Sequence, residues 1–354
     1  MTIPENALIL DAGNSIIKAK TDTHEVSFPH ALRRLTETEY QNILSRSGFS
    51  GPPHDYLVIN GEPYVVGRSA ERHGTLTGRT GAARYTADYY GVFVAAALAR
   101  TIGMRCPGGS EKCEVAVFGS HAPGDVAYRE ELMRAAVSEW HVRMGNHEQC
   151  FRVTYSNTFD EPVGGLMNVL LTEDGLYYRR TDVRDGRSLV IDIGGHTTDW
   201  LAVNPGGDID YSLSESVTLG IQDVMRDFER SFRANNREAT KDISQLPPDR
   251  VRDAIRTGVF NGGGRQYPCE QEVNEATNVL LNRIRDTFQQ HAGGPLPWDS
   301  IILTGGGSAM LYGHLQPLLG HQRVLLSDNS HENHLANVRG GLKLWKLYKA
   351  HGML

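Results

Sequence analysis

Two short acidic segments of this chain each follow an apolar run and contain glycine. They are Asp11-Ala12-Gly13-Asn14 and Asp192-Ile193-Gly194-Gly195. A turn of this kind points backbone N–H groups at one spot, and glycine lets a phosphate approach the backbone closely. The carboxylate beside the turn suits Mg²⁺, which prefers carboxylates together with phosphate oxygens. The two segments therefore predict binding of a nucleoside triphosphate with Mg²⁺.

The two segments differ in how specifically they indicate a phosphate site. Taken alone, the first is more typical of an ordinary β-hairpin. The second is richer, because Thr197, Thr198 and Asp199 follow its glycines. Both occur in the same strand context, and a third glycine-rich segment, Gly305 to Gly307, follows the apolar run 301–303. The combination favours a phosphate site over two unrelated turns.

Two more residues have a candidate role and an ordinary alternative. Lys18 lies seven positions after Asp11 on the expected returning strand. It could reach the phosphates as a point charge, or it could be a solvated strand lysine. Glu161 could orient an attacking water, as phosphoryl transfer to water requires. Alternatively, it is only an acidic residue at the start of the next helix, where negative charge is favoured.

The elements that position these residues repeat along the chain. Residues 7–10 and 16–20 predict a β-hairpin around the first acidic turn, and residues 189–191 and 200–203 predict the same around the second. The two aspartates are 181 positions apart, about one domain length. We interpret this as a diverged duplication. A further hairpin is predicted at residues 56–67, because Asn60-Gly61 suits a tight primed turn.

Several helices are expected from apolar periodicity. Asp125 is expected to cap a helix with Tyr128, Leu132, Ala135, Ala136 and Trp140 on one face. The clearest amphipathic pattern covers 270–291. A last helix, at about 334–349, is expected to expose a basic face of Lys343, Lys346 and Lys349.

Bulk composition narrows the functional class. The length of 354 residues predicts two domains at roughly 150 residues each. The net charge of −6 argues against general binding to nucleic acid, which needs clustered Lys and Arg. The four cysteines, Cys106, Cys113, Cys150 and Cys269, form no CxxC pair. No signal-peptide pattern or membrane-length apolar run is visible, so we expect a reducing, cytoplasmic setting and no membrane contact.

The order of these segments resembles the actin-like ATPase superfamily. Residues 10–14 with Lys18 are similar to its first phosphate motif, residues 190–199 to its second, and residues 302–307 to its adenosine motif. Within the superfamily the likeness is closest to the ParM-type bacterial and plasmid actins and their archaeal-like relatives. It rests on the compact length, on Glu161-Pro162-Val163-Gly164-Gly165, and on the C-terminal run at 336–341.

The resemblance implies an α/β, bilobal actin-like fold. Each of two RNase H-like lobes would hold a mixed five-stranded sheet flanked by helices, with nucleotide in the interlobe cleft. Lobe I would cover 1–185, with a small inserted subdomain at about 24–85, and a helix at 334–354 would pack back on it. Lobe II would cover 186–333, with a core at 186–220 and 296–333 and a small subdomain at about 221–295.

The resemblance also implies roles for individual residues. Asp11 and Asp192 would bind Mg²⁺ through water, and Glu161 and Asp192 would be catalytic. The nucleotide would be lined by Asp11, Gly13, Asn14, Ser15, Lys18, Gly194, Gly195, His196, Thr197, Thr198, Gly220, Gly305, Gly306, Gly307 and Met310. Asn14 departs from the family's serine, so Ser15 or the Asn14 amide would replace it. His196 stands where many relatives have Gly or Thr.

The implied function is an ATPase that polymerises with ATP, or GTP, and disassembles after hydrolysis. By likeness to ParM, the filament would move plasmid DNA through a DNA-binding adaptor protein, without touching DNA itself. Two alternatives stay open: a non-polymerising small-molecule kinase and a nucleotide-binding scaffold of the same superfamily.

Overall fold

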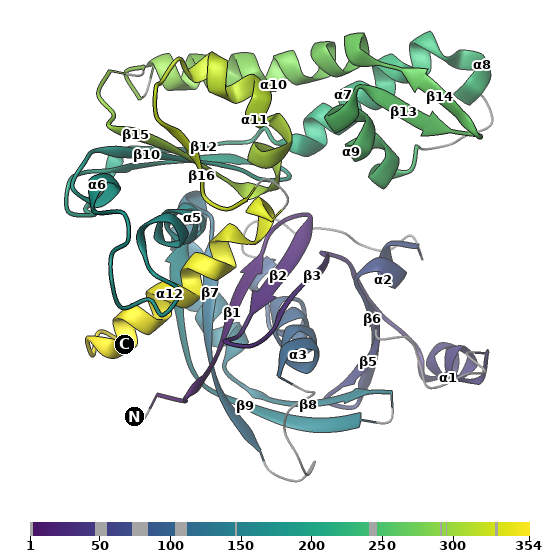
Figure 1. The fold of residues 1–354 in the computed structure, drawn as a ribbon. Helices are drawn as coiled ribbons and strands as arrows, with labels where there is room; N and C mark the ends of the chain where they lie inside the picture. The colour runs from purple at the N-terminus through teal and green to yellow at the C-terminus, as the bar shows by residue number, and fades with distance from the viewer. Residues whose placement is uncertain are drawn as a thin grey trace. The chain divides into compact units, whose positions relative to one another are not determined.

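The computed structural model describes most of the chain in two compact units. One is Met1–Arg179 with Asn337–Leu354, and the other is Arg180–Ala336. Each unit contains a mixed β-sheet flanked by helices (Figure 1), which confirms the predicted fold class. The described residues are 3–46, 55–72, 84–102, 112–145, 147–240, 246–290, 292–294, 296–329 and 332–354.

The first unit is built on a sheet of nine strands within the described residues. Its order is β3-β2-β1-β7-β9-β8-β5-β6-β4. β1 pairs antiparallel with β2 and parallel with β7, and β7 pairs parallel with β9. The strands are β1 (Asn6–Ala12), β2 (Ile16–Lys20), β3 (Glu25–Pro29), β4 (Leu32–Arg34), β5 (Tyr56–Ile59), β6 (Glu62–Val66), β7 (Cys113–His121), β8 (Glu139–Met144) and β9 (His147–Asp160).

The middle residues of β1 and β7 are apolar and buried because helices cover both faces of the sheet. Leu8 and Leu10 of β1 join the core cluster that contains α3 (Tyr90–Thr101). On the other face, α12 (Ala336–Ala350) packs through Gly341 and Trp345 (Figure 1). The unit's other helices are α1 (Glu37–Arg46), α2 (Arg68–Arg72), η2 (Pro123–Tyr128), α4 (Arg129–Ala136) and α5 (Glu161–Leu170).

This first sheet is larger than expected. The predicted five strands, β3-β2-β1-β7-β9, are present, but the sheet continues through β8, β5, β6 and β4. The reason lies in β9, whose 14 residues extend beyond β7. Its first residues pair with β8, and β8 in turn pairs with β5. The predicted hairpin between β5 and β6 is confirmed, since Asn60 and Gly61 both have positive φ, 51° and 84°.

Two helical predictions in this unit were wrong in part. The segment expected as one helix after Asp125 is η2 followed by α4, and Trp140 lies on strand β8. Asp125 makes no cap; its carboxylate accepts a 2.9 Å hydrogen bond from the Tyr85 hydroxyl. Lys343 is not on an exposed basic face. It is buried, and its Nζ donates to Glu173 Oε1 at 2.7 Å.

The second unit holds a five-stranded sheet of order β12-β11-β10-β15-β16. β10 pairs antiparallel with β11 and parallel with β15, β11 pairs antiparallel with β12, and β15 pairs parallel with β16. The pattern reproduces β3-β2-β1-β7-β9 strand for strand, so the predicted repetition of the arrangement is confirmed. The strands are β10 (Ser188–Ile193), β11 (Thr198–Val203), β12 (Ile209–Val217), β15 (Ser300–Thr304) and β16 (Val324–Leu326).

Helices and a separate hairpin complete the second unit. α11 (Gly305–Leu319) packs on β10 and β15, and α10 (Glu270–Gln290) lies against α11 and α7 (Ile221–Asn235) (Figure 1). The predicted amphipathic helix at 270–291 is therefore confirmed. The remaining elements are α6 (Thr181–Arg184), α8 (Arg237–Thr240), α9 (Pro248–Thr257), β13 (Val259–Gly262), β14 (Arg265–Pro268) and η3 (Asn333–Leu335). Among the described residues, no helix is long and apolar enough to cross a membrane.

Candidate functional site

The first hairpin places Asp11 at the carboxyl end of β1, directly opposite Lys18 on β2. The Lys18 Nζ lies 2.7 Å from Asp11 Oδ2. The Asp11 side chain is fully buried, and its other oxygen, Oδ1, has no hydrogen-bond partner among the described residues. A buried carboxylate oxygen with open lone pairs is a good acceptor for a metal-bound water.

The turn after Asp11 is held from two sides. The Gly13 carbonyl accepts a 2.6 Å hydrogen bond from His30 Nδ1, and the Ala12 carbonyl accepts one from Arg84 Nη2. A Cβ at Gly13 would lie 3.1 Å from the Ile16 carbonyl, so a side chain there is crowded. Asn14 and Ser15 are half-buried. The backbone of the turn is thus fixed while its tip stays accessible.

Glu161 is the first residue of α5 and directly follows β9. Its Oε1 lies 3.6 Å from Arg84 Nη2, and its side chain is largely buried. Asp160 occupies the N-cap position without a side-chain cap bond. Glu161 therefore lies in the first helical turn, where a carboxylate is favoured, and it also contacts Arg84.

Arg84 was not among the predicted site residues. It is buried just before α3 and contacts the Ala12 carbonyl, Glu161 and Asp125. Burial lowers the pKa of Arg84, but Tyr85, Glu161, Asp125 and Asp11 raise it, and the net direction is upward. The guanidinium therefore stays charged. The sequence signal was faint: an arginine before a tyrosine-rich stretch that opens a helix of small residues.

The second hairpin repeats the arrangement in the other unit. Asp192 is buried at the carboxyl end of β10, and its register partner on β11 is Asp199, also buried. Thr197 Oγ1 donates to Asp199 Oδ2 at 2.9 Å, and the Gly194 N–H donates to the Thr197 carbonyl at 2.9 Å. His196, at the tip, is exposed. The loop is internally bonded except at that tip.

Helix α7 supports this loop from behind. The Ile221 N–H donates to the Gly194 carbonyl at 3.1 Å, and the Gln222 N–H donates to the Gly195 carbonyl at 2.9 Å. Gly220 is buried, and a Cβ there would lie 2.6 Å from the Gly195 carbonyl oxygen. The Thr198 hydroxyl donates to the Leu219 carbonyl at 2.9 Å. Thr198 and Gly220 thus hold the loop in shape through buried contacts.

The glycine-rich segment was expected to be a turn, but it is the first turn of α11. β15 runs parallel to β10 with Thr304 opposite Asp192, so this helix begins beside the Asp192 carboxylate. Gly305 has a φ of +82°, and a Cβ there would overlap Asp192 Oδ1. The N-terminus of a 15-residue helix offers free N–H groups to an anion. Met310 lies farther along α11, half-buried.

Asn333 is a second residue that the sequence did not reveal. It is fully buried, and its Nδ2 donates to the Gly305 carbonyl at 3.0 Å. Its Oδ1 accepts from Ser327 Oγ and from the Asp328 N–H, both at 2.9 Å. This side chain ties the start of α11 to the segment after β16.

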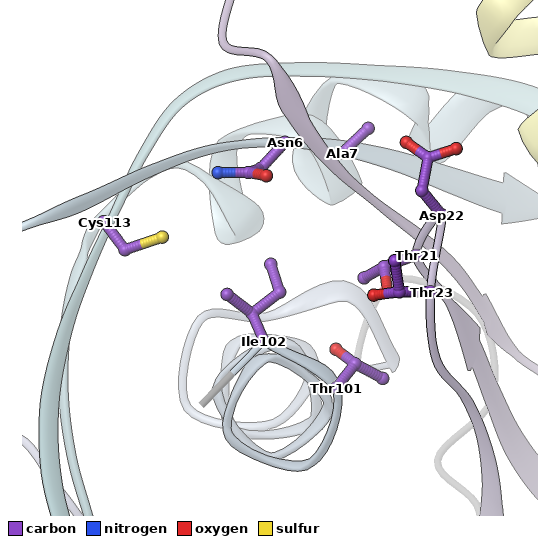
Figure 2. Close-up of a pocket in the computed structure, with 8 residues that line it drawn as sticks. All are labelled: Asn6, Ala7, Thr21, Asp22, Thr23, Thr101, Ile102 and Cys113. Atoms are coloured by element: carbon purple, nitrogen blue, oxygen red, sulfur yellow. The ribbon is translucent and has the colours of Figure 1, made fainter. Parts of the chain in front are cut away.

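Two other features of the first unit lie away from these residues. The hollow in Figure 2 is lined by Asn6 and Ala7, at the opposite end of β1 from Asp11. A cluster of Glu139, His141 and Cys150 could in principle hold a metal ion, but Lys112 Nζ already lies 2.8 Å and 3.0 Å from the two Glu139 oxygens. Cys106 lies outside the described residues.

Comparison with solved structures identifies the architecture. The archaeal actin homolog Ta0583 is 19% identical over 96% of this chain and 98% of that chain, with a TM-score of 0.73. The chain has the actin-like fold. The apo psk41 ParM protein matches at 18% identity over 99% of both chains, with a TM-score of 0.68. A 15-stranded ParM filament from Clostridium botulinum matches at 16% identity over 96% and 99%, with a TM-score of 0.69.

Sequence comparison supports the same assignment over part of the chain. Residues 190–317 match the family model of the archaeal actin homologue MreB-like C-terminal domain. This segment contains the second hairpin and the start of α11. No curated protein matches the chain significantly. The predicted resemblance to the actin-like superfamily is thereby confirmed, through the fold for the whole chain and through sequence for this segment.

Proposed function

We propose that this chain is an actin-like ATPase that binds ATP with Mg²⁺, polymerises in that state and disassembles after hydrolysis. One observation carries the proposal. The same antiparallel hairpin, with a buried aspartate at the carboxyl end of a strand that also has a parallel neighbour, occurs in both units. Binding of one polyphosphate by both copies would explain why the acidic hairpin occurs twice.

In this proposal both hairpins hold the phosphates of a single nucleotide. Gly13, Asn14 and Ser15 supply one set of donors, and residues 194–197 with the start of α11 supply another. Gly306 is exposed, so the first turn of α11 is open to a ligand, and Met310 would pack on the adenosine. Ta0583, in the same fold, is known in a complex with ADP. ATP or GTP would fit the same phosphate donors.

The residues around Asp11 fit a water-coordinated Mg²⁺. Asp11 Oδ1 is buried without a hydrogen-bond partner in the described part of the chain, and Asp192 is its counterpart on β10. Bound Mg²⁺ would offset the charge on the β- and γ-phosphates. Lys18 keeps a cation at Asp11 and supplies a point charge toward the phosphates. Glu161 would accept a hydrogen bond from the attacking water and orient it.

The proposed function includes self-association into a filament and the transport of a cargo. The ParM structure from Clostridium botulinum is a filament of 15 strands, which supports self-association in this fold. We propose that the filament works in the cytoplasm and moves plasmid DNA through a DNA-binding adaptor. The net charge of −6 suits a polymer that does not contact DNA directly.

Sedimentation with and without ATP tests polymerisation, and negative-stain electron microscopy of the same samples identifies filaments. We expect a nucleotide-dependent pellet. A kinase would stay in the supernatant and turn over only with a second substrate. E161Q should bind nucleotide, release phosphate slowly and leave persistent filaments. If E161Q hydrolyses at the wild-type rate, Glu161 is only a first-turn helix residue.

A binding experiment tests whether the two hairpins share one nucleotide. D11N and D192N should each abolish binding, with a wild-type stoichiometry of one per chain. If each unit bound its own nucleotide, each variant would retain half of the wild-type stoichiometry. Competition between ATP and GTP in the same assay decides the preferred base.

A further inference from the structure

We propose that Arg84 is a positioning residue that fixes the Glu161 carboxylate to the Asp11 hairpin and keeps it ionised for hydrolysis. The inference rests on the proposed ATPase function and adds a residue to its mechanism. Arg84, the Asp11 hairpin and Glu161 all belong to the first unit.

One guanidinium group joins three separate segments. Arg84 Nη2 donates to the Ala12 carbonyl, beside Asp11, and lies 3.6 Å from Glu161 Oε1 at the start of α5. Arg84 Nη1 lies 3.5 Å from Asp125 Oδ2 on η2. The planar fork of arginine can serve several acceptors at once, whereas lysine carries its charge at a single point. An arginine at this position can therefore contact all three acceptors, and a lysine cannot.

Burial strengthens the effect of Arg84 on the charge of the Glu161 carboxylate. The Arg84 side chain is 4% exposed and that of Glu161 is 13% exposed, so water screens the pair poorly. A buried carboxylate without a nearby cation favours its protonated form, which is a poorer acceptor for a water hydrogen. Arg84 would thus set both where the carboxylate lies and whether it is charged.

The other partners of Arg84 explain how it is held. The guanidinium lies 5.2 Å from the Tyr85 ring centroid, and the Tyr85 hydroxyl donates to Asp125 Oδ2 at 2.9 Å. Asp125 therefore receives hydrogen bonds from both residues. Arg84 and Tyr85 both interact electrostatically with Glu161, and Asp125 on η2 faces Arg84 and Tyr85. Asp160, next to Glu161 in the chain, lies 3.3 Å from His121 Nδ1. Of these five residues around Glu161, Arg84 is the one that carries a permanent positive charge.

The test is a double-mutant cycle between Arg84 and Glu161 on the full chain. R84K should lower the ATP hydrolysis rate by about tenfold and leave the dissociation constant for ATP within about threefold. In an E161Q background, R84K should change the residual rate by less than about twofold, because the group through which it acts is already lost. The acid limb of the R84K pH–rate profile should move to higher pH.

Arg100 supplies the matched control. It is also a largely buried arginine of the first unit, with Nη2 3.1 Å from Asp55 Oδ1 and 3.5 Å from the Val66 carbonyl, and its guanidinium lies over the Phe28 ring. Asp55, Val66 and Phe28 belong to segments other than the β1–β2 hairpin and α5. R100K should reduce thermal stability. It should leave the acid limb of the pH–rate profile unchanged and show no interaction energy with E161Q in a double-mutant cycle. If R84K does not fold, R84Q takes its place in the cycle, because the glutamine amide keeps neutral donors for the Ala12 carbonyl.

The outcomes separate this inference from the proposed function. If the wild type hydrolyses ATP and R84K lowers the rate equally in both backgrounds, Arg84 is structural and the inference is overturned. A wild-type rate retained by R84K overturns it too. If the wild type binds ATP but does not hydrolyse it, the proposed function itself fails.

Discussion

Lys18 lies directly opposite Asp11 in the β1–β2 ladder, and its Nζ is 2.7 Å from Asp11 Oδ2. The carboxylate is fully buried, while the lysine side chain is 13% exposed. A buried charge is tolerated when a hydrogen-bonded partner compensates for its lost hydration. Lys18 is therefore needed at the hairpin even before any phosphate arrives.

Replacing Lys18 by methionine should both destabilise the chain and weaken nucleotide binding. Removing one partner of a buried pair costs about 3 kcal/mol, because the remaining charge is left uncompensated. We expect K18M to lower the melting temperature and to raise the dissociation constant for a fluorescent ATP analogue at least tenfold. K20M is the control, because Lys20 pairs with the partly exposed Glu25. Equal effects of K18M and K20M on binding would contradict a phosphate role for Lys18.

Replacing Gly305 by alanine should disrupt the site through a steric clash. Gly305 has a φ of +82°, and a Cβ would overlap Asp192 Oδ1 and approach the Ile193 carbonyl at 2.6 Å. We expect G305A to lose measurable nucleotide binding in isothermal titration calorimetry. G320A separates the steric clash from the strain of a positive φ, because Gly320 has a φ of +58° with nothing within 4 Å of its Cβ. That variant should cost only about 1 kcal/mol of strain and bind normally.

Local patterns predicted the hairpins well. Short apolar runs and the Asp-x-Gly turn were enough to place Asp11 on a strand beside a returning strand, and the second run before Asp192 predicted that the arrangement repeats. The Asn60-Gly61 hairpin followed from turn chemistry alone. In these cases the determining interactions lie within about ten residues, so the sequence contains them.

Residues defined by long-range contacts could not be predicted in this way. Arg84 contacts the Ala12 carbonyl 72 positions away, and Lys343 is buried against Asn168, 175 positions away. On a helical wheel Lys343 belongs to the basic face, and only the packed fold shows that it is inside. Asn333 is likewise identified by its bonds to Gly305 and Leu303. The sheet's extension beyond β9 depends on pairings that no local pattern encodes.

Replacing Asn333 by aspartate should loosen the start of α11. The side chain is fully buried, and its Nδ2 donates to the carbonyls of Gly305 and Leu303. An aspartate oxygen at that position would face two carbonyl oxygens instead, which costs about 2–4 kcal/mol. We expect a lower melting temperature and weaker ATP binding, with saturating ATP restoring part of the loss. N42D, at an exposed position of α1, should change neither; a stable, tight-binding N333D would exclude this role.

Replacing Glu25 by glutamine should loosen the attachment of α12 in a pH-dependent way. Arg339 Nε and Nη2 lie 3.1 Å and 2.5 Å from the two Glu25 oxygens. The hydrogen bond from Arg339 outweighs burial and, with help from Lys20, lowers the pKa of Glu25 from 4.5 to about 2. Because the folded-state pKa is depressed, the stabilisation is fully present above pH 4.5 and is lost as the pH falls toward 2.

Hydrogen exchange of the α12 amides measures this effect locally. At pH 7 E25Q should reduce protection by an amount equivalent to about 1 kcal/mol, since the pair is partly exposed and screened. The difference from wild type should shrink as the pH falls below 4.5 and should also shrink in 1 M salt. E62Q is the control, because the exposed side chains of Glu62 and Arg34 pair on β6 and β4, at the opposite edge of the sheet from β3. A difference that persists unchanged at pH 3 would show that packing, rather than this ion pair, holds α12 to β3.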